Sequence, residues 1–192
     1  MRLISGSAGG IPLDVPKSVT RPTQDRVRQA VFNMLGPLVE GARVLDLFAG
    51  SGALGLECLS RGSESALLVD QDRGACEVIR RNLAKTRLAG ATVRQGDVFK
   101  TVGQLARESA CFDLVFADPP YAHKPGEADL CAKLLESADF TALAPAGASV
   151  VLESLATRRS APPAPEGWEL MRERDYGSTR IVWLRRVGSG HG

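Results

Sequence analysis

The chain has 192 residues, of which 44% are hydrophobic and 24% are charged, and its net charge at pH 7 is +2. These values are ordinary for one globular domain and exclude a disordered polycation, and no apolar run approaches the length of a membrane span. The charge is uneven, because residues 1–43 carry six Lys/Arg and three acids whereas the remaining residues carry 18 Lys/Arg and 19 acids. A basic N-terminal part is compatible with a phosphate-backbone partner, although solvated surface charge is the simpler explanation.

The cysteines and histidines give no sign of a disulfide framework or a metal site. No C-x-x-C pair is present, and the residues are Cys58, Cys76, Cys111, Cys131, His123 and His191. The cysteines lie within apolar stretches, as reduced buried thiols do. The N-terminus lacks the apolar region of a signal peptide, so we expect a cytoplasmic protein without metal and without membrane attachment.

The N-terminal part of the chain predicts a small β-hairpin and a connector. Polar and apolar residues alternate over residues 1–15 around three glycines, and two prolines follow within residues 16–22. Thr23 can cap a helix that runs to Leu35. We therefore divide the chain into a hairpin with its connector at residues 1–22, a main domain at residues 23–187 and a flexible tail at residues 188–192.

From Arg43 onward, strand-like and helix-like segments alternate. The predicted strands cover residues 43–48, 65–69, 91–94, 112–117, 148–153, 168–174 and 179–184. The predicted helices cover residues 53–61, 73–88, 98–107 and 129–138. This alternation predicts an α/β fold with a doubly wound, seven-stranded and mostly parallel sheet. The last two strands are joined by a short turn, which predicts an antiparallel pair at one edge of the sheet.

The most informative segment is the end of the predicted strand at residues 112–117. The strand is apolar on both faces and is followed by Asp118, Pro119, Pro120 and Tyr121. Because proline cannot donate to a ladder, the chain leaves the sheet here, at the edge where open α/β sheets bind ligands. A carboxylate, carbonyls left free by the prolines and an aromatic ring suit a planar molecule with an –NH2 group. A strand end with a core tyrosine is the alternative.

The first predicted strand runs into a turn of small residues before a helix. The candidate cofactor-binding residues here are Asp46, Phe48, Ala49, Gly50, Ser51 and Gly52. The glycines would let the backbone approach a ligand and supply N–H donors near a helix N-terminus. The pattern is not G-x-G-x-x-G, and an acid at the tip of the strand would repel a pyrophosphate. It suits a ligand with ammonium and sulfonium charges, which S-adenosylmethionine carries; the alternative is a turn whose glycines serve geometry only.

Acids also follow the second and third predicted strands. Asp70, with Gln71 beside it, can accept hydrogen bonds from two ribose hydroxyls. Asp97 can accept from the adenine amino group, with Val98 packing on the ring. Each acid alone is more often an exposed turn residue, but the ends of successive strands bring all of them to one rim.

Several motifs resemble a known superfamily. They are D-L-F-A-G-S-G-A-L-G-L-E at residues 46–57, L-S-R-G at residues 59–62, the acid at Asp70 and D-P-P-Y at residues 118–121. Together they resemble the Rossmann-like class I S-adenosylmethionine-dependent methyltransferases. Further motifs resemble the RsmD-like bacterial 16S rRNA guanine-N2 methyltransferases: R-P-T-x-D-R-V-R at residues 21–28, A-V-F-N at residues 30–33 and Y-G-S-T at residues 176–179. This resemblance covers nearly the whole chain.

The resemblance implies methyl transfer from S-adenosylmethionine to the exocyclic N2 amine of a guanine in 16S rRNA. It implies that Asp118 and the Pro119 carbonyl hold the amine and that Tyr121 stacks on the base. The expected partner is 16S rRNA within an assembled or assembling small ribosomal subunit. Candidates for RNA contact or site closure are Arg21, Thr23, Arg26 and, with less support, Arg28.

Three positions depart from the family pattern. Asp70 stands where glutamate is usual, which keeps the charge but shortens the reach. Gln29 replaces a common glutamate, and Ile11 replaces a common basic residue, removing one phosphate contact from the hairpin.

Other functions stay open at this point. The same chemistry on adenine N6 or cytosine N4, in RNA or DNA, or on a protein glutamine amide uses a similar motif; the glutamine enzymes generally begin it with Asn rather than Asp118. A non-catalytic nucleic-acid-binding module on the same fold is a second alternative. A nicotinamide-dependent oxidoreductase is a third, but the third fingerprint glycine is missing.

Overall fold

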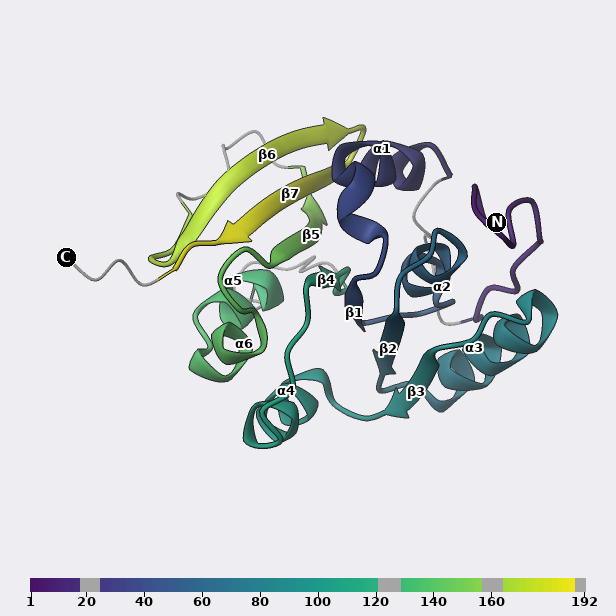
Figure 1. Ribbon diagram of the computed structural model, residues 1–192, viewed down its shortest axis with the longest axis horizontal. Coiled ribbons are helices and arrows are strands. Elements are labelled where there is room, and N and C mark those ends of the chain that lie inside the picture. The colour runs from purple at the N-terminus through teal and green to yellow at the C-terminus, as the bar shows by residue number, and fades with distance from the viewer. Residues whose placement is uncertain (18–24, 121–128, 157–163, 189–192) are drawn as a thin grey trace.

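The computed structural model describes residues 1–17, 25–120, 129–156 and 164–188. One sheet of seven strands, in the order β3-β2-β1-β4-β5-β7-β6, has helices on both faces (Figure 1). The strands are β1 Arg43–Leu47, β2 Ser65–Asp70, β3 Ala91–Gln95, β4 Leu114–Ala117, β5 Ser149–Leu155, β6 Trp168–Tyr176 and β7 Thr179–Arg186. The helices are α1 Asp25–Leu35, the 3-10 turn η1 Gly36–Val39, α2 Ala53–Ser60, α3 Arg73–Thr86, α4 Val98–Arg107, α5 Leu130–Leu135 and α6 Ala138–Leu143.

The sheet has a point where the order of its strands reverses. β1 pairs in parallel with β2 on one side and with β4 on the other. The crevice outside the carboxyl ends of the strands at such a point is where open α/β sheets bind ligands. The doubly wound, seven-stranded and mostly parallel sheet is therefore confirmed, and so is the antiparallel pairing of the last two strands.

One predicted helix is wrong. The segment at residues 129–138 forms not one helix but α5 and α6, separated at Ser137. The Ser137 hydroxyl accepts a hydrogen bond from the Phe140 N–H at 3.3 Å and so caps a new helix. An N-cap of this kind favours a fresh start over continuation, which the apolar pattern alone does not reveal.

The predicted N-terminal β-hairpin is only partly present. Residues 1–13 form two antiparallel arms, but the only bridge between them in the described segment is Arg2–Pro12. Pro12 has no N–H to extend a ladder. At Gly6 the backbone has φ +81°, and a Cβ there would overlap the Ser60 carbonyl, so the arms lie directly against α2.

A buried carboxylate holds this N-terminal segment in place. Glu57 of α2 is fully buried and accepts hydrogen bonds from the backbone N–H groups of Ile4 and Ser5, at 2.7 and 3.0 Å. It also pairs with Arg61 at 2.7 Å, whose guanidinium lies 4.6 Å from the centre of the Phe32 ring. One side chain therefore links the segment, α2 and the core.

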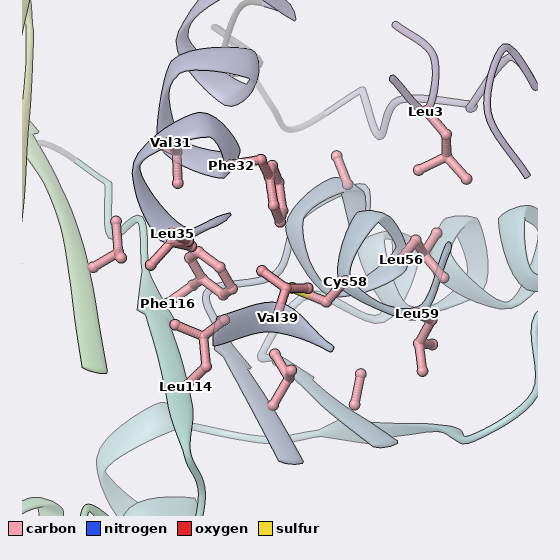
Figure 2. Close-up of a cluster of buried hydrophobic side chains, with 14 of the residues drawn as sticks. Leu3, Val31, Phe32, Leu35, Val39, Leu56, Cys58, Leu59, Leu114 and Phe116 are labelled. Atoms are coloured by element: carbon pink, nitrogen blue, oxygen red, sulfur yellow. The ribbon is translucent and has the colours of Figure 1, made fainter. Parts of the chain in front are cut away.

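Helix α1 covers the sheet next to the reversal point. Its Phe32 packs against Phe116 of β4, with ring centres 6.0 Å apart. Val31 and Leu35 point into the same cluster as Leu114 (Figure 2). Within the described ranges, no helix is long and apolar enough to cross a membrane.

We expect Glu57→Ala to lower the free energy of unfolding by about 3 kcal/mol, because it leaves two part-buried N–H groups and Arg61 without their acceptor. Denaturant unfolding measures this loss, and hydrogen exchange should show faster exchange at the Ile4 and Ser5 amides. The matched control is Glu64→Ala, which removes an exposed acid and should change stability by less than about 0.5 kcal/mol. Equal losses in both variants would contradict an anchoring role for Glu57.

Candidate cofactor and substrate site

Three carboxylates lie close together at the strand-reversal point. Asp46 is in β1, Asp70 ends β2 and Asp118 directly follows β4. Burial, together with the negative charges of Asp118 and Asp70, raises the pKa of Asp46 to about 8. The structure thus brings together acids that are up to 72 positions apart in the chain, as their places at strand ends predicted.

Asp46 itself is placed differently from the prediction. It lies inside β1 rather than at the tip, and only 2% of it is exposed. Its Oδ2 accepts a hydrogen bond from the Gly55 N–H at 2.9 Å, in the first turn of α2. The carboxylate therefore contacts the positive end of a helix, behind the glycine-containing loop.

The loop at residues 48–52 has an unusual backbone. Phe48, Gly50 and Gly52 have φ values of +61°, +56° and +76°. For Phe48 this conformation is strained, and such strain is found at functional sites. A Cβ at Gly52 would lie 3.0–3.2 Å from Leu68 and Ile79, so glycine is needed here for packing on the core as well as for its φ.

The two glycines were predicted to supply N–H donors near a helix N-terminus, and in the structure both N–H groups donate within the protein. The Gly50 N–H donates to Oδ2 of Asp70 at 2.8 Å, and the Gly52 N–H donates to the Ala49 carbonyl at 2.7 Å. Asp70 also accepts from the Asp72 N–H through Oδ1 at 2.8 Å. Asp70 therefore fixes the loop after β1 to the turn after β2, and the exposed Gln71 lies in that turn.

Ser51 connects the same loop to the N-terminal segment. Its carbonyl accepts from Nδ2 of Asn82 at 2.9 Å, and its hydroxyl lies 3.3 Å from the Met1 sulfur. Nδ2 of Asn82 also donates to the Asp14 carbonyl at 3.0 Å, and its Oδ1 accepts from the Asp14 N–H at 2.8 Å. The buried Asn82 amide thus joins α3, the loop and the segment.

The acid that follows the third strand, Asp97, has a structural role of its own. Asp97 caps α4 by accepting from the Lys100 N–H at 2.9 Å, and it is exposed. Val98 is only 3% exposed and packs in the core, which argues against an adenine ring resting on its side chain.

Asp118 lies at the carboxyl end of β4, beside the point where the strand order reverses. It is half-buried, while all four residues of β4 before it are buried. It lines a small cavity of about 10 Å³ with Val31 of α1 and Glu153 of β5. Pro119 is buried and Pro120 exposed, so the chain leaves the sheet as predicted; Tyr121 lies outside the described residues.

Glu153 is a candidate site residue that sequence reasoning missed. It is 7% exposed and lines the same cavity as Asp118. Burial, together with the charges of Asp129, Asp118 and Glu153, raises the pKa of the neighbouring Cys131 thiol to about 12. The available signal was an acid that directly follows the apolar run at residues 150–152 within strand β5.

The predicted RNA-contact residues have different outcomes. Arg26 is exposed and lines an open hollow of about 500 Å³ between α1 and the N-terminal segment, together with Arg2 and Gln29. Arg28 is fully buried and donates to the Arg2 carbonyl at 2.6 Å and to Asp25 at 2.7 Å, so the suggestion that it meets RNA is wrong. Arg21 and Thr23 lie outside the described residues. Within the described ranges, no group of three or more His, Cys, Asp or Glu is placed to hold a metal ion.

Comparison with known proteins gives consistent matches. The family described as "Conserved hypothetical protein 95" matches residues 1–185. "Ribosomal RNA small subunit methyltransferase D" of Escherichia coli strain K12 is 36% identical over 191 residues, covering 99% of this chain and 92% of the relative. "Putative rRNA methyltransferase YlbH" of Bacillus subtilis is 45% identical over 123 residues, covering 63% of this chain and 67% of the relative.

A solved structure shows the same fold over the whole chain. The "Putative methyltransferase yhhF from Escherichia coli" superposes with a TM-score of 0.82 at 34% identity, covering 97% of this chain and 98% of that one. These matches confirm the resemblance carried by the sequence motifs. The chain belongs to the Conserved hypothetical protein 95 family, which includes the small-subunit rRNA methyltransferase D proteins.

Proposed function

We propose that this protein transfers a methyl group from S-adenosylmethionine to the exocyclic N2 amine of a guanine in 16S rRNA. The observation that carries the proposal is the convergence of Asp46, Asp70 and Asp118 at the strand-reversal point, in a chain of this family. The name of the E. coli relative supports the rRNA substrate.

The chemistry of the site fits a cationic cofactor better than a dinucleotide. Three carboxylates near one loop favour a ligand that carries positive charge and would repel a pyrophosphate. Asp70 and Gln71 would take the ribose, and the exposed Asp97 would take the adenine amine. Asp46 lies behind the loop, and in its ionised form it would attract a cation without direct contact. When bound, S-adenosylmethionine supplies an electrophilic methyl group on its sulfonium.

The residues after β4 position the nucleophile. Guanine N2 is a poor nucleophile because its lone pair is delocalised into the ring. Hydrogen bonds from its two N–H groups to Asp118 and to the Pro119 carbonyl would hold the nitrogen and help it to pyramidalise, and holding the reacting groups in line supplies much of the rate. Asp118 or water takes the released proton. Tyr121 would stack on the base and fix its plane.

The substrate must present its guanine out of the RNA stack to reach this crevice. Arg26, at the rim of the hollow beside α1, would contact a phosphate. Arg21 and Thr23 are further candidates for RNA contact. A compact domain with a short N-terminal segment suits a partner that is already folded, such as a small ribosomal subunit.

The direct test incubates the protein with labelled S-adenosylmethionine and small subunits, or naked 16S rRNA, from cells that lack the gene. The RNA is then digested to nucleosides and analysed by mass spectrometry. We expect N2-methylguanosine as the product. Methylated adenosine or cytidine would replace the guanine assignment by the alternative acceptors, and S-adenosylmethionine binding without any transfer would favour a non-catalytic module.

Asp118→Asn should lower kcat by at least about 100-fold, because an amide holds the guanine amine less well and cannot take a proton. The Kd for S-adenosylmethionine, measured by calorimetry, should change by less than about threefold. Asp139→Asn, at an exposed position of α6, is the matched control and should keep full activity. A fully active Asp118→Asn enzyme would remove this residue from the catalytic role.

Asp46→Asn should make stability less dependent on pH. Since the pKa of Asp46 is about 8 in the folded protein and about 3.8 in the unfolded chain, folding retains a proton between these values. Stability therefore falls as pH rises through this window, by up to about 1.4 kcal/mol per pH unit. Asparagine can still accept from the Gly55 N–H but does not titrate.

The difference in free energy of unfolding between Asp46→Asn and the natural protein, measured with denaturant, should accordingly favour the variant more at pH 8 than at pH 5. The affinity of the variant for S-adenosylmethionine at pH 8 should be weaker than that of the natural protein. Parallel stability profiles for the two proteins would show that the buried carboxyl does not titrate in this range.

A further inference from the structure

Helix α3 has an exposed stripe of arginines that the proposed active site does not use. Arg73 and Arg80 lie seven residues apart in the helix, which places their side chains on the same side about 10 Å apart along its axis. Arg87 follows the last helical residue as the C-cap, with φ +54°. All three are exposed, and the Arg73 side chain is 81% exposed. Among the described residues, neither Arg80 nor Arg87 forms a salt bridge.

Two other basic residues of α3 bind the N-terminal segment. Arg81 and Lys85 of α3 both pair with Asp14 of that segment, at 3.7 and 2.5 Å. On the inner side of the helix, Asn82 bonds to the backbone of Asp14 in both directions. The helix and the segment therefore form one fixed surface, whose other border is the hollow beside Arg26.

The helices on the two faces of the sheet differ in charge. Together with its capping residues, α3 carries five basic side chains and the two acids Asp72 and Glu77. On the opposite face of the sheet, α4, α5 and α6 with their capping residues carry three basic and five acidic side chains (Figure 1). A nearly neutral chain thus has one basic and one acidic helical face, and only the basic one is complementary to a polyanion.

We propose that the exposed face of α3 binds the phosphate backbone of the RNA substrate, away from the target base. This inference rests on the proposed function and extends the RNA contact from Arg26 and Arg2, across the N-terminal segment, to Arg80 and Arg87. A guanidinium pairs well with phosphate, and such contacts position the RNA without reading its sequence. α3 spans about 21 Å, so the contact suits a helical RNA element rather than a single flipped nucleotide.

The test compares two double variants that remove the same charge from opposite faces. Arg80→Ala with Arg87→Ala alters the stripe, and Lys100→Ala with Arg107→Ala removes two exposed basic residues from α4. Binding to unmethylated small subunits is measured at several salt concentrations between about 50 and 200 mM. For the α3 variant, the logarithm of the association constant should fall less steeply with the logarithm of the salt concentration, the slope being smaller in magnitude by about 1.4–1.8. Its binding at the lower salt concentration should be about tenfold weaker. Its KM for the subunit should rise, while its kcat and its Kd for S-adenosylmethionine stay unchanged; the α4 variant should behave as the natural protein.

Two outcomes would overturn the proposal: equal losses in the two variants, which would mean that only net charge matters, or an unchanged salt slope in the α3 variant. If that variant proves unstable in thermal unfolding, Arg80→Gln alone should lower the slope by about half as much, and an unchanged slope there counts equally against the proposal. A natural protein that neither binds nor methylates RNA would instead contradict the proposed function. A fully active natural protein with two indistinguishable variants would remove only the role of α3.

Discussion

The arrangement of the site depends on a carboxylate buried between the central strand and the first turn of α2. Asp46 accepts a hydrogen bond from Gly55 and so ties the first turn of α2 to β1, across a loop in which Phe48, Gly50 and Gly52 have left-handed conformations. Burial and two neighbouring acids oppose the ionisation of Asp46. The site therefore carries negative charge that it cannot neutralise internally except by holding a proton, and a cationic ligand relieves this cost. Selectivity for a sulfonium over a pyrophosphate follows from this local electrostatics.

The N-terminal segment depends on the same two helices that support the loop. Glu57 of α2 binds its first arm, and Asn82 of α3 binds its end while also bonding to the carbonyl of Ser51. A segment of irregular backbone is thus held by buried polar contacts rather than by a β-ladder. Asn82 contacts the segment and the loop at once. A displacement of the N-terminal segment would therefore be passed through this one side chain to the loop on the cofactor side of the site.

Sequence periodicity predicted the positions of helices and strands better than it predicted which of their side chains are buried. All seven strands and the bounds of α4 agree with the prediction, because alternating apolar segments and caps such as Asp97 are local signals. Burial is not local. Arg28 sits next to Val27 on a stripe of α1 that the N-terminal segment covers, and its charged side chain gave no hint of this. Glu153 was missed for the same reason, since what surrounds an acid on a strand depends on segments distant in the chain.

A net charge of +2 conceals two separate electrostatic environments. Asp46, Asp70 and Asp118 are buried or half-buried, where solvent screens them little, whereas the arginines of α3 are exposed. Exposed charges separated by more than about 10 Å are largely screened at 0.1 M salt. The basic face can therefore attract a phosphate backbone without neutralising the acids around the loop, and those acids can favour a cation without repelling RNA bound along the outside. Burial thus allows one small domain to bind partners of opposite charge.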